Sequence, residues 1–187
     1  MRVSKEPEVR KQEILDTAMK LFAEKGYEVT TMTDIAKAVG VVSGLCYKYF
    51  SSKYELYQAA LKEYVKEYSE PIIAILDSEE ESFEAYMVKI KEYFIKTDGK
   101  EKYHDFFHKR GNEMFNIQLS MSMCENARPH MEQFLLRLKQ KGFIRVKDYK
   151  VSAAFILYGE IPILNDENLT SAEKADNVIE IMKKIIM

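Results

Sequence analysis

Two short helical stretches within residues 31–50 constrain the fold of this 187-residue chain more than any other feature. Thr31 and Asp34 have the spacing of a capping box, in which each side chain bonds the backbone of the other. A helix is therefore expected to begin at Thr31 and to end near Gly40. About three residues then precede a second stretch over 44–50, and helices joined by so short a turn must cross steeply, as in a helix-turn-helix.

Apolar spacing predicts helices on both sides of this pair. Residues 8–25 carry one apolar stripe at three- and four-residue spacing, and Gly26 can end that helix. A longer helix is expected from Lys53, with Pro71 kinking or ending it. Its apolar residues follow at four-residue spacing: Leu56, Ala60, Tyr64, Tyr68 and Ile72. Further helices are expected near 80–97, 102–110, 112–127, 129–141, 148–165 and 171–187.

The composition agrees with an all-α fold of about nine helices. Gly (7) and Pro (4) are few, which favours long helices over irregular loops. Apolar residues make up 47% of the chain, enough for a sizeable core. We expect a three-helix helix-turn-helix head at residues 1–52 and a larger helical body for effector binding and dimerisation at residues 53–187.

Charge and cysteine content exclude several classes of protein. The net charge is −2, and residues 1–62 hold 10 Lys and Arg against 8 Asp and Glu, so the head is only slightly basic. Cys46 and Cys124 have no CxxC or Cys/His neighbours, which argues against a disulfide framework or a zinc cluster. The first residues lack the apolar run of a signal peptide, and no stretch approaches a membrane span. We expect a cytoplasmic protein with no membrane partner.

The second short stretch has the residues expected of a recognition helix, which must bring small or polar residues to the bases of the major groove. Gly44 allows close approach of the backbone, Ser43 can bond a base edge or a phosphate, and Leu45 suits a thymine methyl group. Tyr47, Lys48 and Tyr49 are donors suited to phosphates, and Thr31 and Lys53 stand at helix amino termini that favour anions. The predicted DNA-binding set is Thr31, Thr33, Ser43, Gly44, Leu45, Tyr47, Lys48, Tyr49 and Lys53.

Alternatives stay open for some of these residues. Tyr47 or Tyr49, taken alone, can equally be a packing tyrosine. Cys46 is interpreted as a small core residue, with a redox switch as the alternative. Lys5, Arg10 and Lys11 can touch phosphates, although neighbouring glutamates argue against a strongly basic arm.

Residues 10–57 resemble the amino-terminal signature of the TetR family of bacterial regulators, LF..GY..T-T...IA..GV..G..Y.YF.SK..L. The matching positions are Gly26-Tyr27, Thr31, Ile35-Ala36, Gly40-Val41, Gly44, Tyr47, Tyr49-Phe50, Lys53 and Leu56. Val42 and Leu45 are apolar where the family often has polar residues, so base reading is expected to depend on methyl contacts and DNA shape. The resemblance implies a ligand cavity in the body and a dimer built as a four-helix bundle.

A helix-turn-helix that reads two half-sites requires a dimer with an apolar face. The last two predicted helices carry the expected residues, although both stripes can instead face their own core. The predicted dimer interface is Val151, Ala154, Phe155, Tyr158, Val178, Ile181, Met182 and Ile185.

Aromatic and methionine residues in the middle of the chain give the expected effector pocket, with core packing as the alternative. The predicted pocket residues are Tyr86, Tyr93, Phe94, Phe107, Met114, Phe115, Met121 and Phe155. Polar residues that can enter it are His108, Glu113, Asn116, Gln118, Glu125 and Glu160. A carboxylate among them would favour a cationic, hydrophobic effector, because an unpaired buried charge is costly. His104 and His108, at i and i+4, lack a convincing third ligand, so no metal is expected.

The leading hypothesis is a ligand-responsive repressor that binds a palindromic, double-stranded operator as a homodimer. Its effector would be small and largely hydrophobic. The alternative is a helical protein-interaction or DNA-architectural module without an effector. No catalytic triad, metal cluster or phosphate loop is legible, so neither an enzyme nor a cofactor is expected.

Overall fold

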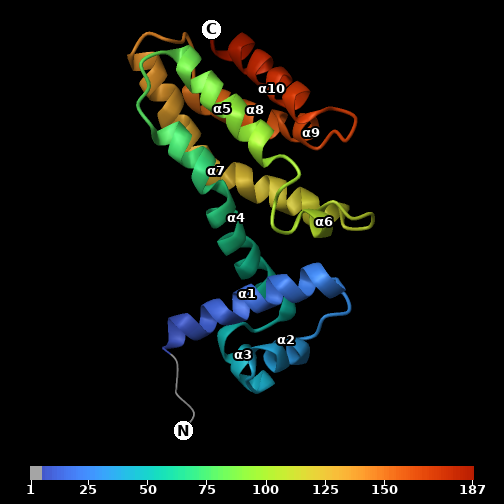
Figure 1. Ribbon diagram of the computed structural model, residues 1–187. Coiled ribbons are helices and arrows are strands. Elements are labelled where there is room, and N and C mark those ends of the chain that lie inside the picture. The colour runs from blue at the N-terminus through green and yellow to red at the C-terminus, as the bar shows by residue number, and fades with distance from the viewer. Residues whose placement is uncertain (1–5) are drawn as a thin grey trace. The chain divides into compact units, whose positions relative to one another are not determined.

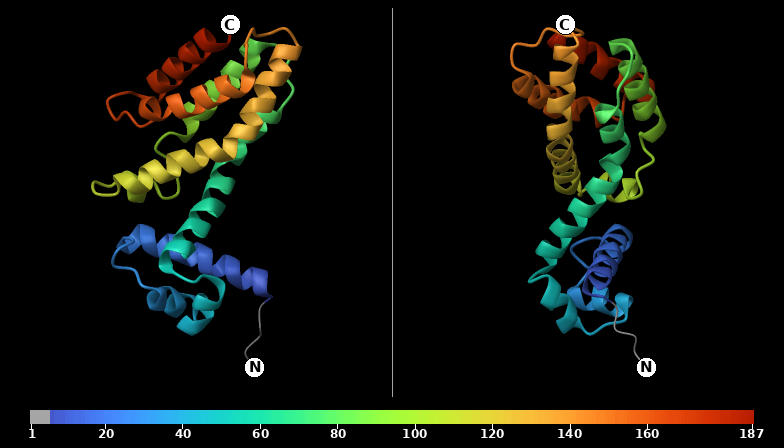
Figure 2. Two further views of the ribbon diagram at one scale, coloured as in Figure 1. Left: turned by 180° about the vertical axis from the view of Figure 1, so that it is seen from behind. Right: turned by 90° about the vertical axis from the view of Figure 1, so that its left-hand side faces the viewer.

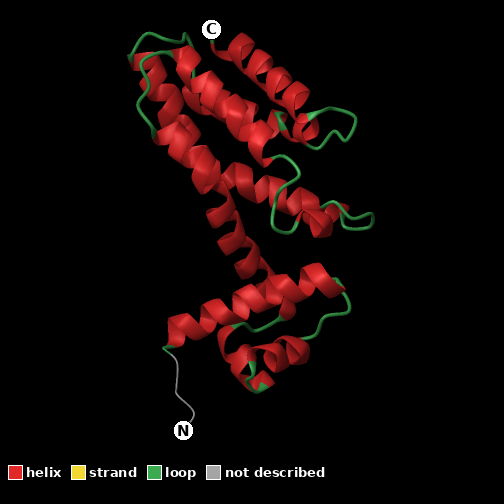
Figure 3. Ribbon diagram, in the orientation of Figure 1, coloured by secondary structure: helices red, strands yellow, loops and turns green. Residues whose placement is uncertain are grey.

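The computed structural model describes residues 6–187, and within this range it contains helices and loops but no strand (Figures 1 and 3). The expected all-α fold is confirmed, with ten helices in this range where about nine were predicted. Their bounds are α1 Pro7–Lys25, α2 Met32–Val39, α3 Ser43–Tyr49, α4 Lys53–Asp77, α5 Phe83–Thr97, α6 His104–Phe107, α7 Glu113–Gln140, α8 Tyr149–Gly159, α9 Ile161–Leu164 and α10 Ser171–Ile186. None of these helices has the length and apolar character that a membrane crossing requires.

Three prolines lie inside a helix or in its first turn, and the helix bounds around them differ from those predicted from the sequence. α4 continues through Pro71, and α7 continues through Pro129, so the prediction of separate helices at 112–127 and 129–141 is wrong. A proline removes one backbone donor, and both helices nevertheless continue on either side of it, over 25 and 28 residues. Conversely, the predicted helix over 148–165 is divided into α8 and α9, with Pro162 in the first turn of α9.

The chain forms two compact units. Unit 1 comprises the residues up to Val65 together with Tyr103–Asn116, and unit 2 comprises Lys66–Lys102 with Ile117–Met187. The predicted domain boundary between residues 52 and 53 therefore does not follow the compact units. The first half of α4, all of α6 and the start of α7 belong with the head, because their side chains share its core.

Aromatic contacts show this sharing within unit 1. The ring of Phe115, at the start of α7, lies 5.3 Å from the ring of Tyr27 and 5.3 Å from that of Tyr57 on α4. Tyr27 and Tyr57 are 5.4 Å apart, and Phe22 of α1 completes the group at 5.2 Å from Tyr27. α1 also packs against α2 and α6, and α2 against α3. The aromatic group thus joins α1, α4 and the start of α7, while α2 and α6 pack on α1 and α3 packs on α2.

Unit 2 has α5 packed along α10, and α10 also contacts α8 and α9 (Figures 1 and 2). Its core is centred on Phe134, Leu135 and Leu138 of α7, which are fully buried. The ring of Tyr86 meets that of Phe134 edge-on at 5.0 Å. At the end of α5, Asp98 accepts bonds from Ser171 and Lys174 at the start of α10 and so connects the two helices.

Candidate nucleic-acid interface

The turn between α2 and α3 has the geometry predicted from the sequence. Oγ1 of Thr31 accepts a 3.1 Å bond from the backbone N–H of Asp34, and Oδ2 of Asp34 accepts a 3.0 Å bond from that of Thr31. The Thr31 hydroxyl also donates to Oδ2 of Asp34, and this bond, followed by the bond from the Thr31 backbone N–H, lowers the pKa of Asp34. Gly40 ends α2 with a φ of 77°, a left-handed conformation that favours glycine. The capping box and the requirement for glycine are both confirmed.

α3 is buried on one side only. Cys46 is its one fully buried residue, while Gly44, Tyr47 and Lys48 are exposed. Burial also raises the pKa of the Cys46 thiol, which opposes formation of a reactive thiolate. Cys46 is therefore a core residue that anchors α3, as the sequence predicted, and the opposite face of α3 is open.

The predicted base-reading residues occupy the first turn of α3. Gly44 is exposed, and Ser43 and Leu45 are half-buried. Val42 is the N-cap residue of α3 and is 69% exposed, although its side chain is apolar and makes no cap bond. Val42 was noted in the sequence only as a departure from the family pattern. Its exposure beside Gly44 adds it to the candidate interface as a methyl-reading residue.

The predicted phosphate-binding residues are not equally available. Tyr47 and Lys48 are exposed on α3, and Thr33 is exposed on the first turn of α2. The hydroxyl of Thr31 donates to Asp34 at 2.6 Å, so its donor is already used. Tyr49 is half-buried beside Phe50, with ring centres 6.5 Å apart, which favours the packing interpretation for this tyrosine.

Lys53 requires a correction. Its ammonium donates to the carbonyl oxygen of Tyr27 at 2.8 Å and to that of Glu28 at 3.2 Å, and it lies 4.3 Å from the centre of the Tyr27 ring. Two of its three donors are therefore used within unit 1. These contacts join the start of α4 to the loop after α1. We therefore assign Lys53 a structural role in place of the predicted phosphate contact.

The residues before and within α1 contribute less to the candidate interface. Lys5 lies outside the described residues. Arg10 is paired with Glu13 at 2.8 Å, and Lys11 is half-buried. Lys37, by contrast, is exposed in the last turn of α2 and was not identified from the sequence. Its position on the helix that precedes the turn makes it a further candidate phosphate contact.

The structure divides the predicted effector-pocket residues between the two units. In unit 1, Phe107 stacks on Tyr64 at 5.8 Å, and Phe115 belongs to the aromatic core. In unit 2, Tyr86 is in the core, and Tyr93 and Phe94 are half-buried on α5. The remaining predicted pocket residues are surface residues: Met114 is 66%, Met121 41% and Phe155 65% exposed. Such exposure argues against a place for these three side chains in an enclosed pocket within one copy of the chain.

The predicted dimer residues also separate into two groups. Val151, Phe155 and Ile181 are exposed, and Ala154, Tyr158 and Ile185 are half-buried. Val178 and Met182 are 5% and 3% exposed, because they face the core of their own unit. The prediction for these two residues is wrong, since periodicity locates an apolar stripe but not its midpoint.

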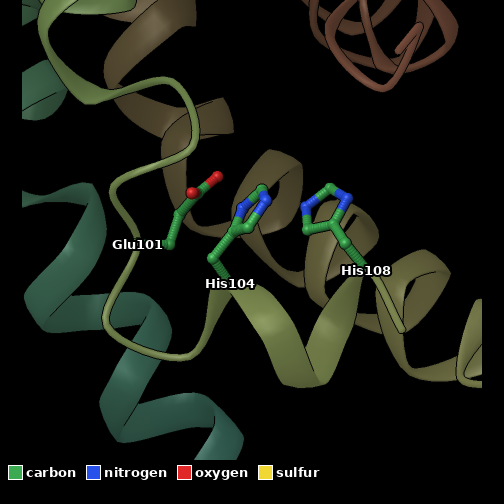
Figure 4. A group of neighbouring side chains, drawn as sticks. All are labelled: Glu101, His104 and His108. Atoms are coloured by element: carbon green, nitrogen blue, oxygen red, sulfur yellow. The ribbon is translucent and has the colours of Figure 1, made fainter.

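The polar pocket candidates have different surroundings. Nδ1 of His108 lies 3.3 Å from Nδ2 of Asn116 within unit 1. The ring centres of His104 and His108 are 4.2 Å apart, and Figure 4 shows these two side chains next to each other. Glu113 and Glu125 are exposed, whereas Gln118 and Glu160 are half-buried in unit 2. His130, also in unit 2, bonds Asp77 at 2.8 Å.

The fold and the α2–α3 geometry define a helix-turn-helix protein. Residues 14–60 match the family described as bacterial regulatory proteins, tetR family. The crystal structure of a putative TetR-family transcriptional regulator from Mesorhizobium loti superposes with a TM-score of 0.72 at 19% identity, covering 98% of this chain and 99% of that one. At this identity the likeness concerns the fold alone.

Two curated relatives match the amino-terminal part of the chain. The biofilm operon icaADBC HTH-type negative transcriptional regulator IcaR of Staphylococcus aureus is 44% identical over 52 residues, 28% of each chain. The HTH-type transcriptional repressor KstR2 of Rhodococcus jostii is 40% identical over 73 residues, 37% of this chain and 36% of the relative. The chain thus matches about a third of the length of these relatives. The similarity to the TetR family in sequence is therefore confined to the amino-terminal part of the chain.

Proposed function

We propose that this protein is a transcriptional repressor that binds operator DNA through α3 and acts as a homodimer in the cytoplasm. The observation that carries the proposal is the one-sided burial of α3, in which Cys46 is buried while Gly44, Tyr47 and Lys48 stay exposed. A helix of seven residues with this pattern suits the major groove, where its first turn meets the bases. Both curated relatives are named as negative regulators or repressors, which supports repression.

The proposed contacts follow from exposure. Val42, Gly44 and Leu45 read the bases, largely through methyl contacts, and Ser43 bonds a base edge or a phosphate. A second group positions the helix on phosphates without reading sequence, and its members are Thr33, Lys37, Tyr47 and Lys48.

The homodimer part of the proposal uses the exposed apolar residues of α8 and α10. Val151 and Phe155 are one turn apart on α8 and are each 65% exposed, and Ile181 of α10 is 43% exposed. Large exposed apolar side chains of this kind are typical of a surface that a partner covers. A second copy as partner supplies the second recognition helix that a palindromic operator requires.

The proposal extends to control by a small effector bound in unit 2. An effector shifts DNA binding only by its different affinity for the DNA-bound and free states. A helical interaction module without effector remains the second candidate. It predicts operator binding that no small molecule changes.

The direct test is protection of the DNA upstream of the protein's own gene, repeated at several salt concentrations. We expect a protected palindrome, with half-site centres about 34–36 Å apart or a multiple of that distance, and affinity that falls steeply with salt. Protection without symmetry, or affinity equal on unrelated DNA, would contradict the proposal.

A further inference from the structure

Two imidazole rings and one carboxylate meet in the short stretch of chain from Glu101 to His108. One ligand atom from each of Glu101, His104 and His108 lies within 4.8 Å of those of the other two. Figure 4 shows the carboxylate of Glu101 and the ring of His108 on either side of the ring of His104. Among residues 6–187 this is the one such group of His, Cys, Asp or Glu side chains. Glu101 therefore supplies the third ligand that the two histidines lack in the sequence pattern.

The two histidines are held one helical turn apart. α6 begins at His104, and the backbone N–H of His108 donates to the carbonyl oxygen of His104 at 2.9 Å. Side chains four residues apart in a helical turn lie on the same face, and these two ring centres are 4.2 Å apart. Phe106 and Phe107 lie between them in the chain and are 3% and 1% exposed, so the core of unit 1 holds the turn in place. Glu101 precedes the turn by three residues, so one short segment positions all three groups.

The surroundings of the three side chains suit a bound ion. All three are half-buried, so an ion from solvent can reach them while their motion is limited. Nδ2 of Asn116, on α7, lies 3.3 Å from Nδ1 of His108. The amide oxygen of Asn116 can accept a bond from Nδ1–H when Nε2 of His108 binds a metal. A hydrogen bond of this kind orients a metal-binding histidine and makes it a stronger ligand.

The donor atoms favour zinc over magnesium or calcium. Two imidazole nitrogens and one carboxylate oxygen suit Zn²⁺, whereas Mg²⁺ and Ca²⁺ require oxygen ligands. Lys102, Lys109 and Arg110 are exposed in and beside the same stretch, so its net charge does not attract cations in general. Zinc bonds of about 2.0–2.1 Å place neighbouring ligand atoms of a tetrahedral site about 3.3 Å apart. The ligand atoms therefore need to approach by at most about 1.5 Å from their present spacing, which side-chain rotation can provide.

We infer that Glu101, His104 and His108 bind one divalent transition-metal ion of the zinc type, with water in the fourth position. The ion joins the two ends of α6 to the loop before it. A helix of four residues has few backbone hydrogen bonds of its own, so a metal bound across its turn stabilises it. The site is independent of the proposed function, because it contains no residue of α3 and requires neither DNA nor a second copy of the chain.

Metal binding to the full-length protein, without a histidine tag and freed of metal by a chelator, tests the inference. Calorimetry is expected to give about one Zn²⁺ per chain, with an affinity at least about 100-fold above that for Mg²⁺. Co²⁺, whose visible spectrum reports its ligands, is expected to bind at the same site and to be displaced by Zn²⁺. Zn²⁺ should raise the melting temperature in a concentration-dependent way, and Mg²⁺ should not.

Variants identify the ligands. Glu101→Gln and His108→Ala are each expected to lower zinc affinity at least about tenfold and to remove the rise in melting temperature. His130→Ala is the matched control, since His130 lies in unit 2, where it bonds Asp77 at 2.8 Å, and zinc binding should be unchanged. His108→Cys keeps a zinc ligand at this position, so it should retain binding and add a sulfur-to-cobalt absorption band that the wild type lacks.

Binding well below one Zn²⁺ per chain, or an affinity no greater than that for Mg²⁺, would overturn the inference. So would an unchanged zinc affinity in Glu101→Gln, or an equal loss in His130→Ala. Circular dichroism of the metal-free samples shows whether each variant is folded. If His108→Ala is not folded, Glu101→Gln and the cobalt spectrum of His108→Cys decide the outcome.

Discussion

The ammonium of Lys53 lies 2.8 Å from the carbonyl oxygen of Tyr27 and 4.3 Å from the centre of the Tyr27 ring. This contact fastens the first turn of α4 to the loop that follows α1. Lys48, five residues earlier, has an exposed side chain in the last turn of α3. Two lysines that look alike in the sequence therefore have different roles, and the difference is measurable.

Lys53→Ala is expected to destabilise the fold, and Lys48→Ala is not. Loss of the Lys53 contacts should lower the free energy of unfolding by about 2 kcal/mol, the usual scale for hydrogen bonds from a charged donor. Lys48→Ala should leave stability unchanged but reduce the slope of log affinity against log salt by about one unit, the loss of one phosphate contact. Urea unfolding and salt titrations of DNA binding measure the two effects. A reduced salt slope in Lys53→Ala, with stability intact, would restore Lys53 to the interface.

Tyr57→Phe is expected to leave the protein as stable as the wild type or to raise the free energy of unfolding by up to about 1 kcal/mol. Tyr57 is fully buried and its hydroxyl has no hydrogen-bond partner among residues 6–187, so removing the hydroxyl removes a desolvation cost and keeps the ring contacts. Tyr86→Phe is the matched control. The Tyr86 hydroxyl donates to Ser78 and accepts from Glu80, so its loss should destabilise by about 1–2 kcal/mol. Destabilisation of similar size in both variants would show that the Tyr57 hydroxyl has a partner.

Phe155→Glu is expected to convert the proposed dimer into a folded monomer. Phe155 is 65% exposed on α8, and a carboxylate there would have to be desolvated when a second copy covers the helix. Analytical ultracentrifugation measures the mass, and circular dichroism confirms that the helices remain. Val88→Glu on α5, where Val88 is 55% exposed, is the control and should stay dimeric. A dimeric Phe155→Glu would place the interface elsewhere.

The stability of the protein is expected to depend on pH through Glu160. The folded pKa of about 8 lies above the value of about 4.3 expected for an unfolded glutamate, so the folded state binds the extra proton. The contribution is complete below pH 4.3, declines as pH rises toward 8, and is lost above it. Glu160→Gln has no such proton, so its advantage over the wild type should grow from pH 5 to pH 8. A difference in melting temperature that is constant over this range would contradict the assignment.

The features that were predicted correctly from the sequence are those that depend on interactions between residues close together in the chain. The Thr31–Asp34 capping box, the left-handed Gly40 and the buried Cys46 depend on neighbours within a few residues, and all three are found as expected. The partner of Lys53 is 26 positions away along the chain. The spacing of apolar residues does not reveal such a contact.

The body of the protein was harder to predict for the same reason. Periodicity identified the stripes of α8 and α10 but not that Val178 and Met182 face the core. Pro129 was interpreted as a break because the sequence does not show which helical turns are supported by packing on either side. The raised pKa of Glu160 likewise comes from burial, which depends on how the helices of unit 2 pack and not on neighbouring residues in the sequence.

The central claim, that α3 reads operator DNA as one half of a dimer, is tested most directly by selecting bound sequences from a random duplex pool. The account predicts enrichment of an inverted repeat with half-site centres one helical turn, about 34–36 Å, or a multiple of it apart. Substituting Ser43 or Leu45 should change the preferred bases in both halves alike, whereas Lys48→Ala should weaken binding to all sequences equally. A pool that shows no enriched repeat, or whose preferred bases are unaffected by changes in the first turn of α3, would contradict it.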